Sequence, residues 1–232
     1  RDYVIEAILE KMELKQDLFK KLDNWCPKHT ILTSNTSSLK LCDMIINVSE
    51  ERKSKCMVNH WYNPAHIMPI AELTFFGDTS DETYNTVEKL YESIEKQTVK
   101  VLKDVPGFIA NRIQQGVARE VFSLIEMGVA SPKDIDKALK FGPAFRYCST
   151  GQLEIADFGG LDIWYIVGNN LLSVMDNSTH ANPLLKNKVE DGKLGVKSGI
   201  GFYEYDQKNI EQIKKNYTKK LLTQLKISKE YI

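Results

Sequence analysis

The order of strand-like and helix-like segments constrains the fold of this chain more than any other feature of its sequence. In the first part, short apolar or β-branched segments alternate with segments of helical periodicity. After Pro106-Gly107, long amphipathic segments follow one another, and no strand-like run appears before Gly201. Alternating strands and helices favour a mostly parallel sheet with helical crossovers. The sequence therefore predicts an α/β domain over residues 1–104 and an all-α domain over residues 105–232.

The expected strands are short apolar runs, whereas the expected helices carry apolar residues three or four positions apart. The strands are Tyr3 to Leu9 (expected to be buried), Thr30 to Thr33, Cys56 to Trp61, Ile70 to Phe75 and Thr98 to Leu102. Five helices are expected over Glu13 to Lys28, Phe108 to Met127, Leu153 to Phe158, Leu161 to Met175 and Leu184 to Asp191, and a Lys-rich helical tail over Asn209 to Ile232. Another helix is expected to begin at a capping box of Thr79 with Glu82 and to end near Gln97. A further helix is expected to begin after a Ser131 cap, with Pro132 at its first position.

Composition is that of an ordinary globular protein and excludes several classes of partner. The 232 residues are 42% hydrophobic and 27% charged, and Lys plus Arg equals Asp plus Glu at 31 each. A net charge of zero argues against a broad nucleic-acid-binding face. No apolar run approaches the roughly 18 residues of a membrane helix. We therefore expect neither nucleic acid nor membrane as a partner.

The cysteines and histidines do not form a recognisable metal-binding or disulfide pattern. Cys26, Cys42, Cys56 and Cys148 show no regular spacing, which favours free thiols and a cytoplasmic location. His60 and His66 lie six residues apart without a cysteine partner, so no metal site is expected.

Four polar residues have the chemistry of a site that oxidises a hydroxyl group. They are Ser37, His60, Glu72 and Asn111. Imidazole can take an alcohol proton near neutral pH, a carboxylate can fix its tautomer, and neutral hydrogen-bonding groups can hold a substrate oxygen. Each also has a structural interpretation when taken alone; Ser37, for example, could cap a helix. Asn111 is unfavourable inside an otherwise apolar helix unless its amide bonds to another group.

Four motifs in this order resemble the L-3-hydroxyacyl-CoA dehydrogenases, which oxidise a 3-hydroxyacyl thioester with NAD. The family's Ser-Asn-Thr-Ser-Ser, His-Phe-Phe-Asn-Pro, Asp-x-Pro-Gly-Phe-x-x-Asn-Arg and Gly-x-x-x-Gly-x-Gly-Phe-Tyr correspond to Ser34 to Ser38, His60 to Pro64, Asp104 to Arg112 and Gly195 to Tyr203. The resemblance runs from Asp2 to about Asp206. It implies a partial Rossmann-type sheet followed by a helical domain that forms a homodimer, and a role in fatty-acid metabolism.

The resemblance also implies a role for each site residue. His60 would take the hydroxyl proton while hydride leaves the same carbon for NAD, and Glu72 would orient its ring. Ser37 and Asn111 would hold the substrate oxygen within reach of His60. Positions matching the family's NAD contacts are Glu10, Lys15, Asn35, Ser37, Asn63 and Lys197. Glu10 and Lys15 are interpreted equally well as ordinary surface charges.

The glycine-rich turn that opens the family's dinucleotide domain is not found in this sequence. That turn, Gly-x-Gly-x-x-Gly, holds the NAD pyrophosphate at a helix N-terminus. Here the first glycine is Gly77. We therefore expect the sequence to be the larger C-terminal part of a longer enzyme. A non-catalytic dimerisation module is the alternative for the chain by itself.

Departures from the family pattern leave two substrate classes open. Ser149 to Glu154 replaces a usual Met-Gly-Pro before an acidic residue, Trp61-Tyr62 replaces Phe-Phe, and Arg146 stands where a smaller apolar group is common. An arginine can bind a free carboxylate bidentately, or it can pair structurally with Glu154 or Asp157. We expect a 3-hydroxyacyl-CoA substrate. A short hydroxy acid or diketone is the alternative, as in the similar carnitine and gulonate dehydrogenases.

Overall fold

The structure, a computed structural model, describes residues 2–231 of the chain. The chain divides into two compact units, Arg1–Ile113 and Gln114–Ile232. The first unit holds the whole five-stranded sheet, and the second is helical apart from isolated β-bridges. This confirms the predicted order of an α/β part followed by an α-helical part. Arg1 and Ile232, the end residues of the predicted domains, lie outside the described residues.

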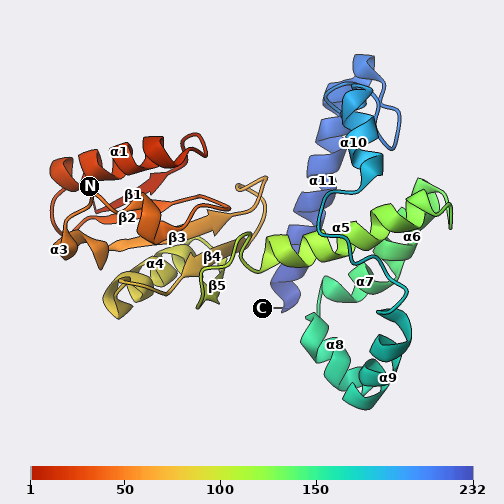
Figure 1. The fold of residues 1–232 in the computed structure, drawn as a ribbon, viewed down its shortest axis with the longest axis horizontal. Coiled ribbons are helices and arrows are strands. Elements are labelled where there is room, and N and C mark those ends of the chain that lie inside the picture. The colour runs from red at the N-terminus through yellow and green to blue at the C-terminus, as the bar shows by residue number, and fades with distance from the viewer. Residues whose placement is uncertain (1, 232) are drawn as a thin grey trace. The chain divides into compact units, whose positions relative to one another are not determined.

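The sheet of the first unit has its strands in sequence order (Figure 1). They are β1 (Tyr3–Glu6), β2 (Ile31–Ser34), β3 (Cys56–Trp61), β4 (Ile70–Thr74) and β5 (Gln97–Val101). The pairs β1–β2, β2–β3 and β4–β5 are parallel, as predicted, whereas β3 and β4 are antiparallel. The chain returns from β3 to β4 through residues 62–69 without a crossover helix, so β4 runs opposite to β3.

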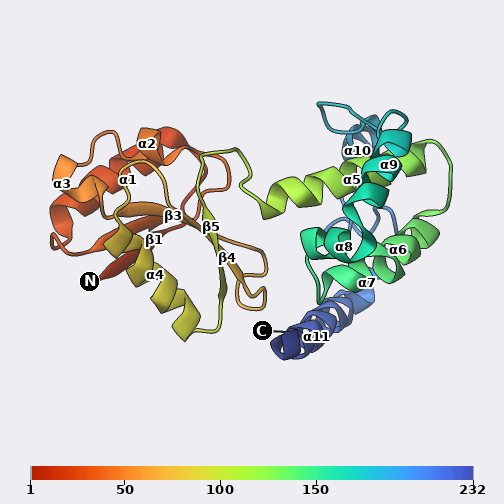
Figure 2. The ribbon, with the colours of Figure 1, turned by 90° about the horizontal axis from the view of Figure 1, so that it is seen from below.

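Helices cover both faces of this sheet (Figures 1 and 2). They are α1 (Met12–Trp25), α2 (Leu41–Met44), α3 (Glu50–Lys53) and α4 (Asp81–Ser93). Because successive strand side chains point to opposite faces, Val58 joins a core with Phe19 of α1, while its neighbour Met57 joins a second core with Tyr84 of α4. His60 has the parity of Val58 and therefore lies on the face that α1 covers.

Strand β1 differs from the sequence prediction. It ends at Glu6 rather than continuing to Leu9, and it pairs with β2 alone. Its residue Ile5 is 42% exposed, so the expectation of a buried strand is wrong. An apolar β-branched run has the same composition at the edge of a sheet as at its centre, which is why the sequence did not distinguish the two.

Two helices begin at serine N-caps whose hydroxyl accepts a backbone hydrogen bond. In α4 the Ser80 hydroxyl accepts a hydrogen bond from the Thr83 backbone N–H. The predicted cap, Thr79, instead donates its hydroxyl proton to the Cys56 carbonyl oxygen at 2.8 Å. In the second unit Ser131 accepts from the Asp134 backbone N–H, as its position before Pro132 predicts.

The helices after β5 are α5 (Ala110–Glu126), α6 (Pro132–Phe141), α7 (Pro143–Tyr147), α8 (Gln152–Gly159), α9 (Leu161–Leu171), α10 (Pro183–Glu190) and α11 (Ile210–Ser228), with 3₁₀ turns at Gln207–Asn209 and Lys229–Tyr231. The short α2, α3 and α7 were not predicted, because four or five residues are too few to show a helical period. Over residues 2–231, no helix is long and apolar enough to cross a membrane.

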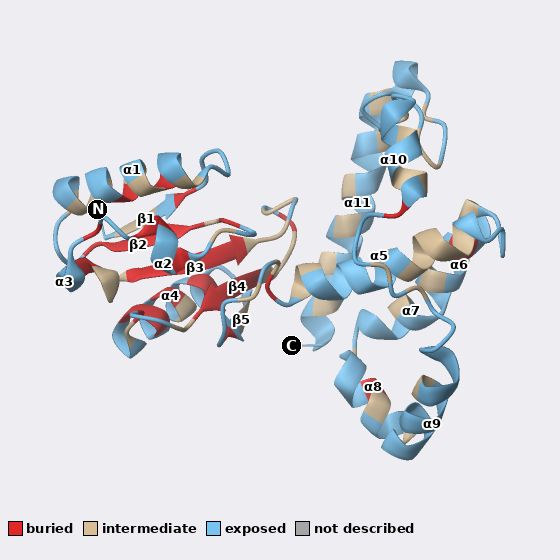
Figure 3. Cartoon of the chain, in the orientation of Figure 1, coloured by how far each residue is buried: buried red, intermediate tan, exposed pale blue. Residues whose placement is uncertain are grey.

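Burial differs sharply between the two units (Figure 3). The strands of the first unit are mostly buried, whereas the described residues of the second unit include only Ile135, Ile155 and Asn182 in the buried class. Along α9 the apolar side chains are exposed, including Tyr165 at 73% and Ile166 at 53%. The helical unit therefore presents a large apolar surface of the kind that marks interaction sites.

Candidate active site

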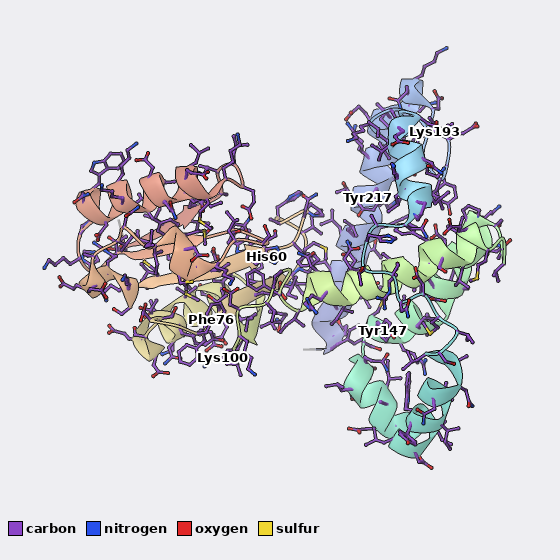
Figure 4. The ribbon with its side chains drawn as sticks, viewed as in Figure 1. His60, Phe76, Lys100, Tyr147, Lys193 and Tyr217 are labelled. Carbon is purple, nitrogen blue, oxygen red and sulfur yellow. The ribbon has the colours of Figure 1, made fainter. Side chains whose placement is uncertain are left out.

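The His60 and Glu72 side chains form a buried pair at the junction of β3 and β4. The antiparallel register sets the two residues directly opposite each other, and His60 Nδ1 lies 2.7 Å from Glu72 Oε2. His60 is 4% exposed and Glu72 is fully buried. Figure 4 labels His60 at the end of β3. The strand pairing thus brings together the two residues that the sequence singled out first.

The second oxygen of Glu72 is held by the start of α5. Its Oε1 accepts hydrogen bonds from the backbone N–H groups of Ile109 and Ala110, each at 2.9 Å. Burial raises the pKa of Glu72, but the hydrogen bonds from His60 and from these two backbone groups outweigh it, so the pKa lies below its usual value. Glu72 therefore stays a carboxylate, with both oxygens engaged.

The turn before α5 aims its backbone at Glu72. Gly107 has a φ of 81°, and Phe108, which is not a glycine, has a φ of 48°. A left-handed conformation is unfavourable for a phenylalanine, and such outliers persist where the surrounding structure holds them. The Phe108 ring is 3% exposed and its centroid lies 5.5 Å from that of the His60 ring. The turn thus packs against the histidine while it delivers N–H groups to its partner.

The opposite nitrogen of His60 meets Ser37. The Ser37 Oγ lies 2.9 Å from His60 Nε2. Because the Glu72 carboxylate can only accept, the neutral imidazole carries its proton on Nδ1 and presents a lone pair at Nε2. That nitrogen accepts from the Ser37 hydroxyl, and it could equally accept from a substrate hydroxyl. Ser37 is not a helix cap, since the next helix, α2, has Lys40 at its N-cap.

Asn111 lies in the first turn of α5, and its Oδ1 accepts a hydrogen bond of 2.7 Å from the Tyr62 hydroxyl. The Tyr62 ring meets the His60 ring edge-on, with centroids 5.5 Å apart. The amide is thus linked to the histidine through Tyr62. Nothing in the sequence singles out Tyr62 for this contact, beyond its place in the His60 motif.

Lys15 is buried, so its interpretation as a surface charge is wrong. Its side chain is 1% exposed, and its Nζ lies 2.6 Å from Glu6 Oε1 and 3.3 Å from Glu10 Oε2. The Glu6 side chain is fully buried and accepts a second hydrogen bond from the Ser34 hydroxyl at 2.6 Å. A buried ion network therefore joins the ends of β1 and β2 to α1.

Glu10 connects this network to the loop that carries Ser37. Its Oε1 accepts from the Thr36 hydroxyl, from the Ser38 hydroxyl at 3.1 Å and from the Ser37 backbone N–H at 3.3 Å. Burial raises the pKa of Glu10, but the hydrogen bonds from Thr36 and Lys15 outweigh it and lower the pKa overall. With its side chain 41% exposed, the carboxylate is also accessible from solvent.

The other two predicted cofactor contacts of the first unit differ in their bonding. Asn35 Oδ1 accepts a 2.8 Å hydrogen bond from the Trp61 backbone N–H, which ties the loop after β2 to β3. Asn63 is exposed, and its side chain has no hydrogen bond within residues 2–231. Its amide is therefore available to a ligand.

These residues have the chemistry to hold the ribose part of NAD. Glu10, Asn35 and Ser37 follow the carboxyl ends of the parallel strands β1 and β2, the edge at which open α/β sheets bind dinucleotides. An exposed carboxylate there can accept hydrogen bonds from ribose hydroxyls. Within residues 2–231, no group of three or more His, Cys, Asp or Glu side chains is placed to hold a metal ion.

Arg146 and Lys197 belong to the second unit and are both exposed. Arg146 lines a surface hollow of about 360 Å³ together with Phe145, Ser149, Thr150, Ile155, Phe158 and Gly159. No salt bridge within residues 2–231 joins Arg146 to Glu154 or Asp157, so the predicted structural pairing is not formed. Lys197 lines a different hollow, of about 470 Å³, beside Lys188 and the stacked rings of Phe122 and Phe202.

Comparison with protein families gives two matches that together span most of the chain. The NAD-binding domain of 3-hydroxyacyl-CoA dehydrogenase matches residues 1–105, and the C-terminal domain of the same enzyme matches residues 107–205. The chain belongs to the 3-hydroxyacyl-CoA dehydrogenase family. The proteins most similar to it include NAD-dependent oxidoreductases of this family, so the resemblance predicted from the motifs is confirmed.

Relatives within the family act on different substrates. A probable 3-hydroxybutyryl-CoA dehydrogenase of Bacillus subtilis is 40% identical over 208 residues, which is 89% of this chain and 70% of that protein. A 5-formyl-3-hydroxy-2-methylpyridine 4-carboxylate 5-dehydrogenase of Mesorhizobium japonicum is 31% identical over 221 residues, 95% of this chain and 71% of that protein. The crystal structure of an enzyme with the latter activity, described as an NAD⁺-dependent dismutase, has a TM-score of 0.91 at 30% identity and covers 98% of this chain and 73% of its own.

The matches extend beyond the residues of the family's C-terminal domain. The family's C-terminal domain ends at residue 205, before α11. An alignment that covers 221 residues of this chain must extend past that point, so the pyridine-carboxylate dehydrogenase shares at least part of the tail. The alignment with the Bacillus protein, at 208 residues, also passes residue 205, and the crystal structure of a 3-hydroxyacyl-CoA dehydrogenase from Archaeoglobus fulgidus covers 95% of this chain.

Proposed function

We propose that this protein catalyses the NAD-dependent oxidation of a 3-hydroxyacyl-CoA to the 3-ketoacyl-CoA, and the reverse reduction. The observation that carries the proposal is the arrangement of His60 between a buried carboxylate at Nδ1 and a serine hydroxyl at Nε2. This arrangement makes His60 a base whose proton-accepting Nε2 is directed at Ser37, the residue that would hold the substrate hydroxyl.

The chain's own residues account for the proton transfer. His60 Nε2 accepts the proton of the substrate hydroxyl as the carbon–oxygen double bond forms. NAD, when bound, would supply the acceptor for the hydride that leaves the same carbon. Glu72 stabilises the imidazolium that results, because its charge lies 2.7 Å from Nδ1. Ser37 and Asn111 hold the substrate oxygen in line with Nε2. In the reduction, His60 returns the proton to the ketone oxygen.

A second candidate substrate is a small acid with a free carboxylate. Arg146 lines one hollow together with two hydroxyl residues and two aromatic rings, Ser149, Thr150, Phe145 and Phe158. A guanidinium with nearby hydroxyl donors binds a carboxylate, and aromatic rings suit a flat or apolar body. The likeness to the solved pyridine-carboxylate dehydrogenase, with a TM-score of 0.91, supports the same interpretation.

The two candidates can be separated by one steady-state experiment on the full-length protein. NADH oxidation is measured with acetoacetyl-CoA and with free keto acids and aromatic aldehyde acids, for the wild type and for Arg146→Leu. For a thioester enzyme we expect turnover of acetoacetyl-CoA at a KM that Arg146→Leu leaves unchanged. A preference for free acids whose KM rises about tenfold or more in Arg146→Leu would establish the second candidate, since a charge-assisted pair contributes roughly 1.5–3 kcal/mol. No NADH binding or oxidation at all would reject both.

We also propose that the protein is a homodimer formed by the helical unit. The exposed apolar residues of α8 and α9 support this, among them Leu153 at 84%, Phe158 at 85% and Tyr165 at 73%. A single copy leaves this apolar surface in water, and a second copy of the same surface can cover it isologously. Light scattering at micromolar concentration should give twice the chain mass. Tyr165→Glu should shift the mass to that of a monomer, and a wild-type monomer would contradict the proposal.

A further inference from the structure

Tyr62 joins the two halves of the candidate active site. It follows β3 directly, and its hydroxyl donates to Asn111 Oδ1 at 2.7 Å, a contact between residues 49 positions apart. Its ring also packs edge-on against His60, at 5.5 Å between centroids. The family motif has phenylalanine at this position, which keeps the ring and lacks the hydroxyl. The contact with Asn111 is therefore made by the atom in which this chain departs from the motif.

In the structure the amide oxygen makes this hydrogen bond, which leaves the N–H end of the amide for a ligand. An asparagine amide offers one acceptor oxygen and two N–H donors, and its two flipped orientations have almost the same shape. With Oδ1 bound to Tyr62, the N–H groups remain, and Nδ2 has no hydrogen-bond partner within residues 2–231. Accepting a hydrogen bond at the oxygen also polarises the amide, which strengthens its N–H donors.

Tyr62 can act as a donor over the whole working range of pH. Burial and the neighbouring charge of Glu72 raise its pKa to about 12. His60, which the Tyr62 ring contacts edge-on, is the titratable group between Tyr62 and Glu72. The hydroxyl therefore remains protonated under conditions in which His60 serves as a base.

We propose that Tyr62 is a positioning residue whose hydroxyl fixes the Asn111 amide so that its N–H groups face the substrate oxygen. An N–H donor stabilises the negative charge that collects on this oxygen during hydride transfer, whereas an amide oxygen turned toward it would repel that charge. The inference rests on the proposed function, because it assigns Asn111 to the substrate oxygen.

The test is a double-mutant cycle of Tyr62→Phe and Asn111→Ala in the full-length protein, with kcat and Tm as readouts. Tyr62→Phe should lower kcat by about 3–10-fold, less than the roughly 10²–10³-fold loss of a direct oxyanion donor, because it acts through Asn111. It should lower Tm by about 2–4 °C, the effect of one hydrogen bond in a chain of this size. In the Asn111→Ala background, both effects of Tyr62→Phe should vanish.

Tyr84→Phe is the matched control, because it removes a hydroxyl bonded to Glu88 on α4, away from the site, and should leave kcat unchanged. An equal loss of kcat from Tyr62→Phe with and without Asn111 would overturn the proposal. So would additive Tm shifts, a readout that does not need activity. If the wild type turned over no substrate but the Tm shifts of the two substitutions were non-additive, the proposed function would be rejected and the Tyr62–Asn111 contact would still stand.

Discussion

Replacing His60 with alanine is expected to lower kcat by about two to four decades, the usual contribution of a general acid–base group. His60 Nε2 faces Ser37 and is the atom that would accept the proton of the substrate hydroxyl. Removing the histidine leaves that proton without an acceptor. The fully buried Glu72 carboxylate would then have no partner at Oε2. The measurement is steady-state NADH oxidation, with NADH affinity determined separately by fluorescence.

His29 provides the matched control for that substitution. It is a histidine of the same unit, exposed at the surface and paired through Nε2 with Asp2 at 3.0 Å. His29→Ala should leave kcat within experimental error of the wild type. A loss below about threefold for His60→Ala, well short of the usual acid–base contribution, would refute its assignment as the base.

Replacing Lys15 with methionine is expected to lower the free energy of unfolding by about 3–5 kcal/mol, the usual effect of breaking a buried ion pair. Methionine fills a similar volume, so the main effect is electrostatic. Glu6 would remain fully buried with its charge uncompensated. Urea unfolding of the wild type and the variant, compared at one pH, measures the difference.

Lys21 is the control for this effect, because it lies on the same helix and is also ion-paired, with Asp17 at 2.6 Å, but is half exposed. Lys21→Met should cost about 0–1 kcal/mol, as surface pairs do. Adding Glu6→Gln to Lys15→Met should recover part of the stability, because it removes the unpaired charge. Equal losses for Lys15→Met and Lys21→Met would contradict the buried network.

The sequence predicted the layered fold well, because alternating periodicity reports local geometry that the sheet then preserves. It also selected His60 and Glu72, which the β3–β4 register sets opposite each other. It could not predict that Lys15 is buried, since burial depends on where Glu6 and Glu10 lie once β1 and α1 have packed. The contact between Tyr62 and Asn111 joins distant segments and shows no periodic signal in the sequence. The exposure of β1 likewise depends on its neighbours in the sheet rather than on its composition.

The direct opposition of His60 and Glu72 across two strands makes their spacing independent of the loop that joins the strands. Their spacing is fixed by the ladder of backbone hydrogen bonds between β3 and β4, and not by the length of the connection, residues 62–69. A β-ladder keeps its register when the loop that closes it is lengthened or exchanged, provided the apolar pattern of the strands is kept. Residues 64–69 can therefore be exchanged between relatives while the proton-transfer pair stays in place, which confines the effect of such an exchange to the loop itself.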